Sequence, residues 1–238
     1  MYSLIHMPDE MRPDVTVLLP VLNEEQTVAE VIDRVLGLPI RLELIVIDDG
    51  SQDRTPEILL GYKDRVRILR NEVRGGKGSA IRKALPYASG RVVIVQDADL
   101  EYFPEEIPPL VAPILDGRAK VVFGTRFSNG LPKAMALPNK IVNVLLALTV
   151  RVLFRAHLTD EATCYKAVET ELMRRMNLQC VRFEFCPEVT AKALRLGQSI
   201  MEVPVSYEPR TKQAGKKIRW TDAPSAFWTL FRYRFGKI

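Results

Sequence analysis

The stretch Val92-Val93-Ile94-Val95-Gln96-Asp97-Ala98-Asp99 decides the fold class of this chain of 238 residues. Its four aliphatic residues predict a buried strand, and two carboxylates spaced i, i+2 follow at the end of that strand. An earlier apolar run, 42–47, ends in the similar acidic sequence Asp48-Asp49-Gly50-Ser51. Ligands of open α/β sheets bind at the carboxyl ends of the strands. Paired carboxylates there can hold a hard divalent cation, so the pattern predicts a site for a diphosphate-bearing substrate.

Strands and helices alternate on both sides of this stretch. Apolar runs predict strands at 15–19, 42–47, 66–69, 92–95, 121–124 and 200–203. Helical spacing and start signals predict helices at 24–36, 53–60, 79–87, from Pro104 to 115, and at 139–154, 184–196 and 226–235. The regular alternation up to residue 124 implies an α/β fold with a mostly parallel central sheet flanked by helices.

The composition fits one large domain with a short extension. Hydrophobic residues make up 47% and charged residues 26% of the chain, which is ordinary for a globular protein. We expect one domain over 1–205 and a basic, aromatic segment over 206–238 that packs on or near it. The three cysteines, Cys164, Cys180 and Cys186, lack zinc-knuckle spacing and predict reduced thiols in a cytoplasmic protein. Residues 1–13 lack the features of a signal peptide.

Positive charge is concentrated at the end of the chain. The net charge is +5, and residues 206–238 hold eight basic residues against Glu208 and Asp222: Arg210, Lys212, Lys216, Lys217, Arg219, Arg232, Arg234 and Lys237. Such a segment suits anionic lipid, phosphate ligands or nucleic acid, or is simply a solvated basic face. Nucleic-acid binding would not explain the acidic pairs at the strand ends, so we expect no nucleic-acid partner.

Two segments have the composition of membrane-surface helices. Residues 139–154 are strongly apolar but are interrupted by Asn143 and Arg151. We expect this segment to be too short to span a bilayer, which takes about 20 apolar residues. It is either a buried core helix or a helix in the membrane interface. Residues 226–235 mix five aromatic residues with Arg232 and Arg234, which is typical of the membrane surface.

Two further motifs lie next to the predicted sheet edge. The sequence Pro20-Val21-Leu22-Asn23-Glu24 either places Asn23 and Glu24 over the edge or is only a turn with a helix cap. The turn Gly76-Lys77-Gly78 opens a helix whose N–H groups favour anions. It matches neither the dinucleotide-binding fingerprint nor the P-loop, which disfavours dehydrogenases and P-loop ATPases.

Taken together, these motifs resemble the family 2 glycosyltransferases with the GT-A fold. The segments that carry the resemblance occur in family order: VTVLLPVLNEE, VIDDGSQDRT, GGKGSA, VQDADLEY, VFGTRF, LTDEATCYK, RFEFCPEVTAK and MEVPVSYEPRTKQAGKK. The set is most similar to the dolichyl-phosphate mannosyltransferases and their bacterial and archaeal relatives. A nucleotidylyltransferase, which can share the fold, should instead carry a Gly-rich, Arg-containing loop after the first strand.

The resemblance implies an inverting, metal-dependent transfer of a hexose of the mannose or glucose class. The donor would be a GDP- or UDP-hexose, and the acceptor a polyprenyl phosphate at the cytosolic face of a membrane. The alternative is the same donor chemistry with a hydroxyl acceptor on a glycan, a lipid or a secondary metabolite. A phosphate acceptor is already anionic, whereas a hydroxyl acceptor needs a carboxylate base, for which Glu184 and Asp160 are the candidates.

The resemblance also assigns roles to individual residues. Asp97 and Asp99 match the pair that holds Mg²⁺ or Mn²⁺, and Glu101 stands where the mannosyltransferases often carry a metal-approaching Gln. Asp99, Arg126 and Arg210 are implied to be catalytic. The acceptor phosphate is assigned to Arg126, Lys216 and Lys217. The nucleotide pocket is assigned to Pro20, Asn23, Glu24, Asp48, Asp49, Lys77, Asp97 and Ala98, and the pocket edge to Asp160, Lys166, Glu184 and Glu188.

Two features depart from the family pattern. Many relatives append transmembrane helices, and this sequence reaches Ile238 without one. We therefore expect peripheral membrane contact through the amphipathic segments or through a membrane partner subunit. The short stretch after Arg126 lacks a clear match to a second acceptor arginine, for which Lys133 and Lys140 are the candidate substitutes.

Overall fold

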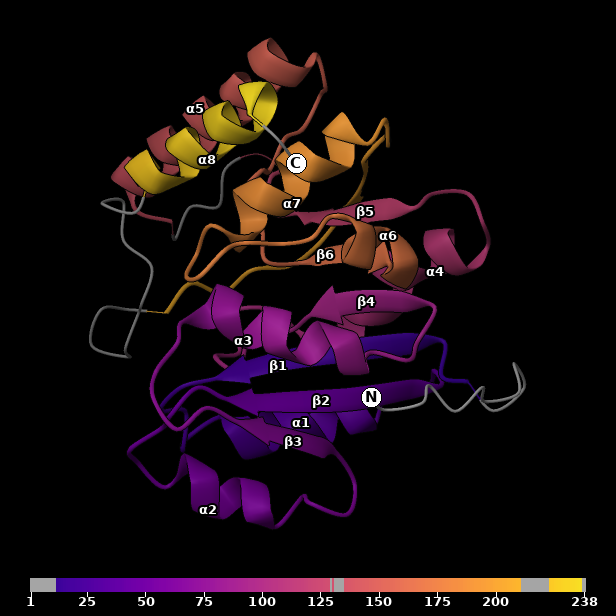
Figure 1. The fold of residues 1–238 in the computed structure, drawn as a ribbon, viewed down its shortest axis with the longest axis vertical. Helices are drawn as coiled ribbons and strands as arrows, with labels where there is room; N and C mark the ends of the chain where they lie inside the picture. Colours follow the sequence, from indigo (N-terminus) through magenta and orange to yellow (C-terminus); the bar gives the residue numbers. More distant parts are fainter. Residues whose placement is uncertain (1–11, 129, 131–134, 211–222, 237–238) are drawn as a thin grey trace.

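The structure is a seven-stranded sheet covered by helices on both faces (Figure 1). It is a computed structural model that describes residues 12–128, 130, 135–210 and 223–236. The strand order is β3-β2-β1-β4-β6-β5-β7, and only the pairings of β6 are antiparallel. The α/β fold and the mostly parallel sheet predicted from the sequence are therefore confirmed.

The elements alternate along the first half of the chain. The strands are β1 (Val15–Val21), β2 (Leu42–Asp48), β3 (Arg67–Arg70), β4 (Val92–Val95), β5 (Val121–Thr125), β6 (Lys166–Glu169) and β7 (Met201–Pro204). The helices are α1 (Val28–Leu36), α2 (Thr55–Leu60), α3 (Lys77–Ala84), α4 (Ile107–Leu115), α5 (Leu137–Phe154), α6 (Thr170–Arg175), α7 (Phe185–Arg195) and α8 (Ala223–Phe235). Two short 3-10 helices are η2 (Leu85–Tyr87) and η3 (Pro104–Glu106).

Three elements differ from the sequence prediction. Strand β6 and helix α6 were not expected, because four strand residues that include Lys166 and Glu169 give little apolar signal. The first helix starts at Val28 rather than at Glu24. Asn23 has a positive φ of 51°, and the Glu24 N–H donates to Thr55 Oγ1 at 2.9 Å, so these residues form a turn tied to α2.

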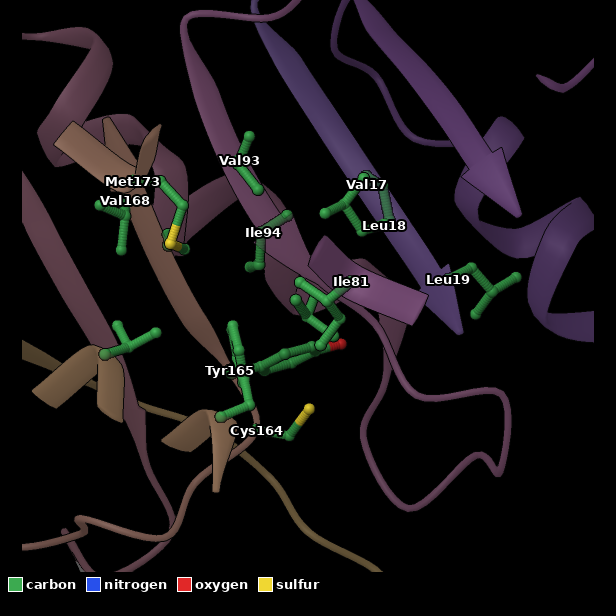
Figure 2. Packing of buried hydrophobic residues seen from close by; sticks show 14 of the residues in the cluster. Val17, Leu18, Leu19, Ile81, Val93, Ile94, Cys164, Tyr165, Val168 and Met173 are labelled. Atoms are coloured by element: carbon green, nitrogen blue, oxygen red, sulfur yellow. The ribbon is translucent and has the colours of Figure 1, made fainter. Parts of the chain in front are cut away.

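The core lies on both sides of the two central strands. Strands β1 and β4 are paired from Val15↔Val92 to Leu18↔Val95, and all four residues of β4 are fully buried. Figure 2 shows side chains of β1 and β4 in one cluster with Ile81 of α3 and with Tyr165 next to β6. Burial on both faces explains why these strands are continuous apolar runs rather than alternating ones.

The order of the strands creates a switch point between β1 and β4. From β1 the chain passes through α1 to β2, and from β3 it passes through α3 back across the sheet to β4. Because crossovers between parallel strands are right-handed, these two helices lie on opposite faces (Figure 1). Open α/β sheets bind ligands in the crevice at such a switch point, so we expect the site at the carboxyl ends of β1 and β4.

The antiparallel strand β6 keeps the later strands in the same direction. It runs opposite to both β4 and β5, and β5 is parallel to β7. The carboxyl ends of β4, β5 and β7 consequently share one edge of the sheet with those of β1 and β2. The amino end of β6, which begins at Lys166, lies at that edge too.

Helices α5 and α8 lie side by side at one end of the molecule (Figure 1). Arg234 Nε donates to Leu153 O at 2.6 Å, which ties α8 to α5. Both helices expose large apolar side chains, namely Leu137, Ile141, Val144, Leu145, Leu148 and Val152 on α5 and Trp228, Phe231 and Phe235 on α8. We call this set the apolar helix face.

The structure corrects the expectation for α5. Only 17% of its residues are buried inside the molecule, so it is not a core helix. It begins at Leu137 and has 18 residues with a mean hydropathy of 1.5. By length and composition it meets the requirement for crossing a membrane, so the expectation that it is too short is wrong. The interruption by Asn143 is not a solvated position either, because that side chain is buried.

A buried ion pair in α7 joins α8 to the loop before α7. Lys192 Nζ lies 2.6 Å from Glu188 Oε1 and 4.4 Å from the centre of the Tyr233 ring on α8. The Glu188 carboxylate also accepts the N–H groups of Gln179 and Cys180 at 2.7 and 2.6 Å. Glu188 thus anchors the 178–182 loop from a buried position, and its assignment to the edge of a pocket stays a prediction.

We expect Glu188→Ala to lower the free energy of unfolding by about 3–5 kcal/mol, because it leaves the Lys192 ammonium buried without its partner. The matched control is Glu30→Ala. Glu30 forms an ion pair with Arg34, also at i, i+4 spacing, but the Glu30 side chain is 57% exposed. The control should cost no more than about 0.5 kcal/mol. Urea unfolding of both variants measures the difference, and equal effects would contradict this account of Glu188.

Candidate functional site

The functional residues predicted from the sequence come mainly from the strand ends at one edge of the sheet. The predicted residues that follow successive strands there are Asn23 and Glu24 after β1, Asp49 after β2, Asp97 to Glu101 after β4, Arg126 after β5, and Arg210 after β7. Hydrogen bonds join these segments to one another, as described below. The fold therefore gathers groups that are far apart in the sequence.

Three carboxylates crowd the turn after β4. Asp97, Asp99 and Glu101 are close enough for the first and third to raise the pKa of the second. Burial is the largest cause, and together these effects raise the pKa of Asp99 to about 7. The buried Gln96 side chain supports the turn by donating to Asp97 O at 2.9 Å. The turn thus holds more negative charge than its surroundings readily stabilise.

Lys77 partly balances this charge. Its Nζ lies 2.5 Å from Asp97 Oδ1 and 3.0 Å from Cys164 Sγ. Burial alone lowers the pKa of Lys77, but the attraction of Asp97 outweighs it and holds the pKa well above its ordinary value. Lys77 therefore remains a cation beside the first of the paired aspartates.

The glycine turn fixes the position of Lys77. Gly76 has a positive φ of 93°, and a Cβ there would lie 2.5 Å from Val181 O. Gly78 N donates to Arg182 O at 2.9 Å, and a Cβ on Gly78 would lie 2.9 Å from the Cys180 backbone. The turn thus packs directly on the loop that Glu188 anchors, and only glycine fits at these two positions.

The carboxylate pair after β2 organises two neighbouring turns. Asp49 accepts hydrogen bonds from Asn71 Nδ2 and from the N–H groups of Gly75 and Gly76, at 2.7–2.9 Å. Asp48 Oδ1 accepts the Ser51 N–H at 2.8 Å. Both aspartates are buried. These contacts shape the walls of the crevice; the assignment of both residues to a nucleotide stays a prediction.

The segment after β1 faces the segment after β7. Glu24 Oε2 accepts a hydrogen bond from Arg210 Nη1 at 2.9 Å, and Thr27 Oγ1 donates to Ala98 O at 2.6 Å. Asn23 Oδ1 instead accepts the Gln52 N–H at 2.8 Å, which belongs to the turn before α2. Glu24 thus points into the crevice, whereas Asn23 braces the turn beside it.

Arg126 is held in one orientation by buried partners. Its Nε and Nη2 donate to the two oxygens of Asp160 at 2.6 and 2.7 Å, and its backbone N–H also reaches Asp160. Nη2 further donates to Asn143 Oδ1 at 3.2 Å. Asn143 belongs to α5, so the guanidinium is tied to the helix that carries much of the apolar helix face. Sequence reasoning had read Asn143 only as an interruption; a lone amide in an apolar helix was the available signal.

The remaining predicted residues of the second half lie farther from the carboxylates. Lys166 is fully buried and donates to Glu161 O at 2.8 Å and Thr190 Oγ1 at 3.1 Å. Burial lowers the pKa of Lys166. Glu184 accepts from Arg182 N and from Ser225 Oγ, at the start of α7. Neither residue contacts the crevice segments through these bonds.

Several predicted lysines of the acceptor site lie outside the described residues, and one predicted residue lies on α5. Lys133, Lys212, Lys216 and Lys217 lie outside the described residues, so the assignments of the last two to an acceptor phosphate stay predictions. Lys140 is described and lies on α5, where it lines a shallow groove with its apolar neighbours. Tyr207 was missed by sequence reasoning, although it stands three residues before Arg210 in a segment that the resemblance had singled out.

Comparison with known proteins finds similar sequences over most of the chain. The model of the family described as glycosyl transferase family 2 matches residues 16–167. The chain is 27% identical over 209 residues to the dolichol-phosphate mannosyltransferase of Pyrococcus furiosus, covering 85% of this chain and 58% of that protein. It is 26% identical over 244 residues to the polyprenol monophosphomannose synthase of Mycolicibacterium smegmatis, covering 94% and 90%.

A solved structure with the same fold is that of glucosyl-3-phosphoglycerate synthase from Mycobacterium tuberculosis with Mn²⁺, UDP and phosphoglyceric acid. It superposes with a TM-score of 0.71 at 24% identity, covering 95% of this chain and 80% of that one. The present chain spans between 36% and 58% of the length of three of the curated relatives that it matches.

The raised pKa of Asp99 gives a pH dependence of stability. Folding raises the pKa of this carboxyl. Such a group stabilises the protein fully at a pH below its pKa in the unfolded chain, and this stabilisation is lost as the pH rises through its pKa in the folded protein. In metal-free protein, the free energy of unfolding should therefore fall between about pH 4 and pH 7 through this group.

Asp99→Asn should flatten that fall, whereas Asp116→Asn, at an exposed surface pair, should leave it unchanged. Urea unfolding in the presence of a chelator at pH 5 and pH 8 measures both. A wild-type slope retained in the Asp99 variant would show that another group carries it.

Proposed function

The chain belongs to glycosyl transferase family 2, and on that premise we propose that it transfers a hexose from a nucleoside diphosphate sugar to a polyprenyl phosphate. The observation that carries the proposal is the convergence at one sheet edge of paired carboxylates, a buried lysine and two arginines. Asp97, Asp99, Lys77 and Arg210 surround the crevice between β1 and β4, and Arg126 follows β5. Carboxylates suit a metal-bound diphosphate, and the cations suit phosphate oxygens.

The residues present fit a divalent cation. In the described ranges, no three His, Cys, Asp or Glu side chains converge as ligands of one ion. Mg²⁺, however, is usually held by one or two carboxylates, with the rest of its shell supplied by substrate phosphates and water. Burial, followed by the negative charges of Asp97 and Glu101, raises the pKa of Asp99, and a cation bound beside these carboxylates would stabilise their charged forms. Asp97 and Asp99 would therefore hold Mg²⁺ or Mn²⁺, which when bound would offset the charge of the leaving diphosphate.

The side chains of this chain account for the remaining electrostatic needs. Lys77, packed against Asp97, and Arg210, hydrogen-bonded at Nε to Asp99 O at 2.6 Å, place two cations next to the diphosphate position. Preorganised charges of this kind stabilise charge as it develops on a leaving group. A phosphate acceptor attacks as an anion, so positioning supplies much of the rate and no base is needed.

The environment of Asp160 favours the phosphate acceptor. A hydroxyl acceptor would need a carboxylate base, and Asp160 was one candidate. Its two oxygens, however, accept the Nε–H, Nη2–H and backbone N–H of Arg126. Glu184, the other candidate, is engaged with Arg182 and Ser225. Arg126 then acts as the oriented cation for an acceptor phosphate.

The apolar helix face supports a lipid acceptor. Arg126 is bonded to Asn143 on α5, so the oriented guanidinium adjoins a helix that exposes a row of aliphatic side chains. A groove of about 230 Å³ on that helix is lined by Leu137, Lys140, Ile141, Val144 and Leu145. A membrane-surface helix has this combination of apolar residues and cations. We place the protein at the cytosolic face of a membrane, with the prenyl chain and lipid surface on the side of α5 and α8.

The first test is the release of nucleoside diphosphate from a panel of UDP- and GDP-hexoses with Mn²⁺ or Mg²⁺. Release should depend on a short polyprenyl phosphate, and the panel identifies the base and the sugar. Asp97→Ala should lower the rate by at least about a thousandfold, which corresponds to ~4 kcal/mol. Asp116→Ala, at an exposed acidic position, is the control. A rate of release that does not depend on the polyprenyl phosphate but rises with a glycan or a small hydroxyl acceptor would favour the alternative acceptor class.

The role of Arg126 is tested with Arg126→Lys, since removing the cation altogether would leave the buried Asp160 without its charged partner. Lysine keeps the charge but loses the two-pronged geometry. The KM for polyprenyl phosphate should rise about tenfold or more, the equivalent of ~1.4 kcal/mol. Slow hydrolysis of the donor without acceptor should stay unchanged. An equal loss of both activities would argue against an acceptor role.

A further inference from the structure

The segment 206–210, which follows β7, is fastened to the turn that carries the paired aspartates. Ser206 N donates to the Glu106 carboxylate at 2.8 Å, and Glu208 N donates to Glu101 O at 3.0 Å. Arg210 Nε donates to Asp99 O. These bonds join groups about a hundred residues apart in the sequence and hold the 206–210 segment against the turn after β4.

Glu101 is the centre of this attachment. Its Oε1 accepts the backbone N–H of Arg210 at 2.7 Å, and its Oε2 accepts the Tyr207 hydroxyl at 2.9 Å. Both carboxylate oxygens are therefore directed at the 206–210 segment. Hydrogen bonds to an ionised carboxylate are stronger than those between neutral groups, so this residue contributes much of what holds the segment in place.

Tyr207 connects this attachment to the acceptor arginine. The guanidinium carbon of Arg126 lies 4.9 Å from the centre of the Tyr207 ring. The centre of the Tyr102 ring lies 5.3 Å from the centre of the same Tyr207 ring. One side chain thus contacts Glu101 through its hydroxyl and Arg126 through its ring face. Burial, followed by the charge of Glu101, raises the pKa of Tyr207, which keeps the hydroxyl protonated as a donor.

The attachment determines where the Arg210 side chain lies. With its backbone N–H held by Glu101, the guanidinium reaches Asp99 O, Glu24 Oε2 and Thr27 Oγ1 at 2.6, 2.9 and 3.2 Å. The donors come from one guanidinium, and the acceptors come from the segments after β1 and β4. Arg210 therefore bridges the two sides of the crevice.

We propose that Glu101 and Tyr207 form a latch that positions Arg210 over the paired aspartates and orients Arg126 at the same time. Glu101 acts through the 206–210 segment as a positioning residue and not as a metal ligand. The consequence for catalysis rests on the proposed function, because Arg210 and Arg126 would then be set together for the donor diphosphate and the acceptor phosphate. The latch itself is a property of the protein that can be measured without substrate.

Limited trypsin digestion tests the latch directly. Cleavage after Arg210 requires its side chain and its backbone N–H to leave their partners. The variants are Tyr207→Phe, which keeps the ring on Arg126 and removes the hydroxyl, and Glu101→Gln, which keeps only one acceptor oxygen. In each, we expect the cleavage rate after Arg210 to rise about tenfold or more, since a lost bond to a charged group favours local opening. Mass spectrometry of the fragments identifies the cleaved bond.

The matched control is Tyr62→Phe. The Tyr62 hydroxyl donates to Asp33 Oδ2 at 3.0 Å on the surface between α1 and α2, away from the crevice. This variant removes the same kind of bond and should leave cleavage after Arg210 unchanged. Equal thermal transitions of the variants and the wild type show that the fold is retained, because only a hydroxyl or a single oxygen has been changed.

The double variant and the metal dependence separate the latch from metal binding. If the two residues act as one latch, the double variant should cleave no faster than either single variant. The metal concentration for half-maximal turnover should stay the same in Tyr207→Phe and Glu101→Gln, while kcat falls in both. Unchanged cleavage in Tyr207→Phe, or additive effects in the double variant, would overturn the latch. A metal midpoint that shifts in Glu101→Gln alone would identify Glu101 as a ligand instead.

The two proposals fail in different ways. A wild-type protein that releases no nucleoside diphosphate with any donor would overturn the proposed function, yet the cleavage rates would still decide whether the latch exists. Conversely, lipid-dependent transfer with unchanged cleavage in both variants would uphold the function and overturn the latch.

Discussion

The shared direction of five strands is the constraint on which the site depends. Because β1, β2, β4, β5 and β7 all point the same way, the segments that follow them meet at one edge of the sheet. The switch point between β1 and β4 lies within that edge, at the place where open sheets bind ligands. A reversal of any one strand would move its polar segment to the opposite edge and remove it from the site. Strand β6, which runs the other way, instead brings Cys164 beside Lys77.

The meeting of these segments at one edge also brings carboxylates close together. Most of them are stabilised by a buried cation or by N–H groups. Lys77 faces Asp97, and Arg126 faces Asp160. Asp49 is satisfied by three N–H donors of the neighbouring turns. Asp99 is the exception, since its pKa remains high. Burial, with Asp97 and Glu101 beside it, sets Asp99 apart from the carboxylates that cations or N–H groups stabilise.

How far the sequence predicted the structure depended on the physical signal of each element. Buried parallel strands such as β4 are continuous apolar runs, and they were found with nearly correct bounds. Strand β6 was missed because a buried lysine and a glutamate lie within it. Helix α5 was placed well, but its partial exposure was not foreseen, since an apolar run does not show whether protein will cover it. The start of α1 was shifted by Thr55, a partner from another element.

The sequence by itself determined the alternation of strands and helices up to β5, the family, and the residue types that stand at the strand ends, because these follow from periodicity and short motifs. Only the tertiary structure decided which of those residues touch. It set Arg126 between Asp160 and Asn143, and it turned both oxygens of Glu101 toward the segment after β7. The physical reason is that hydrogen bonds between segments a hundred residues apart depend on strand direction and register, which no local pattern of residues encodes.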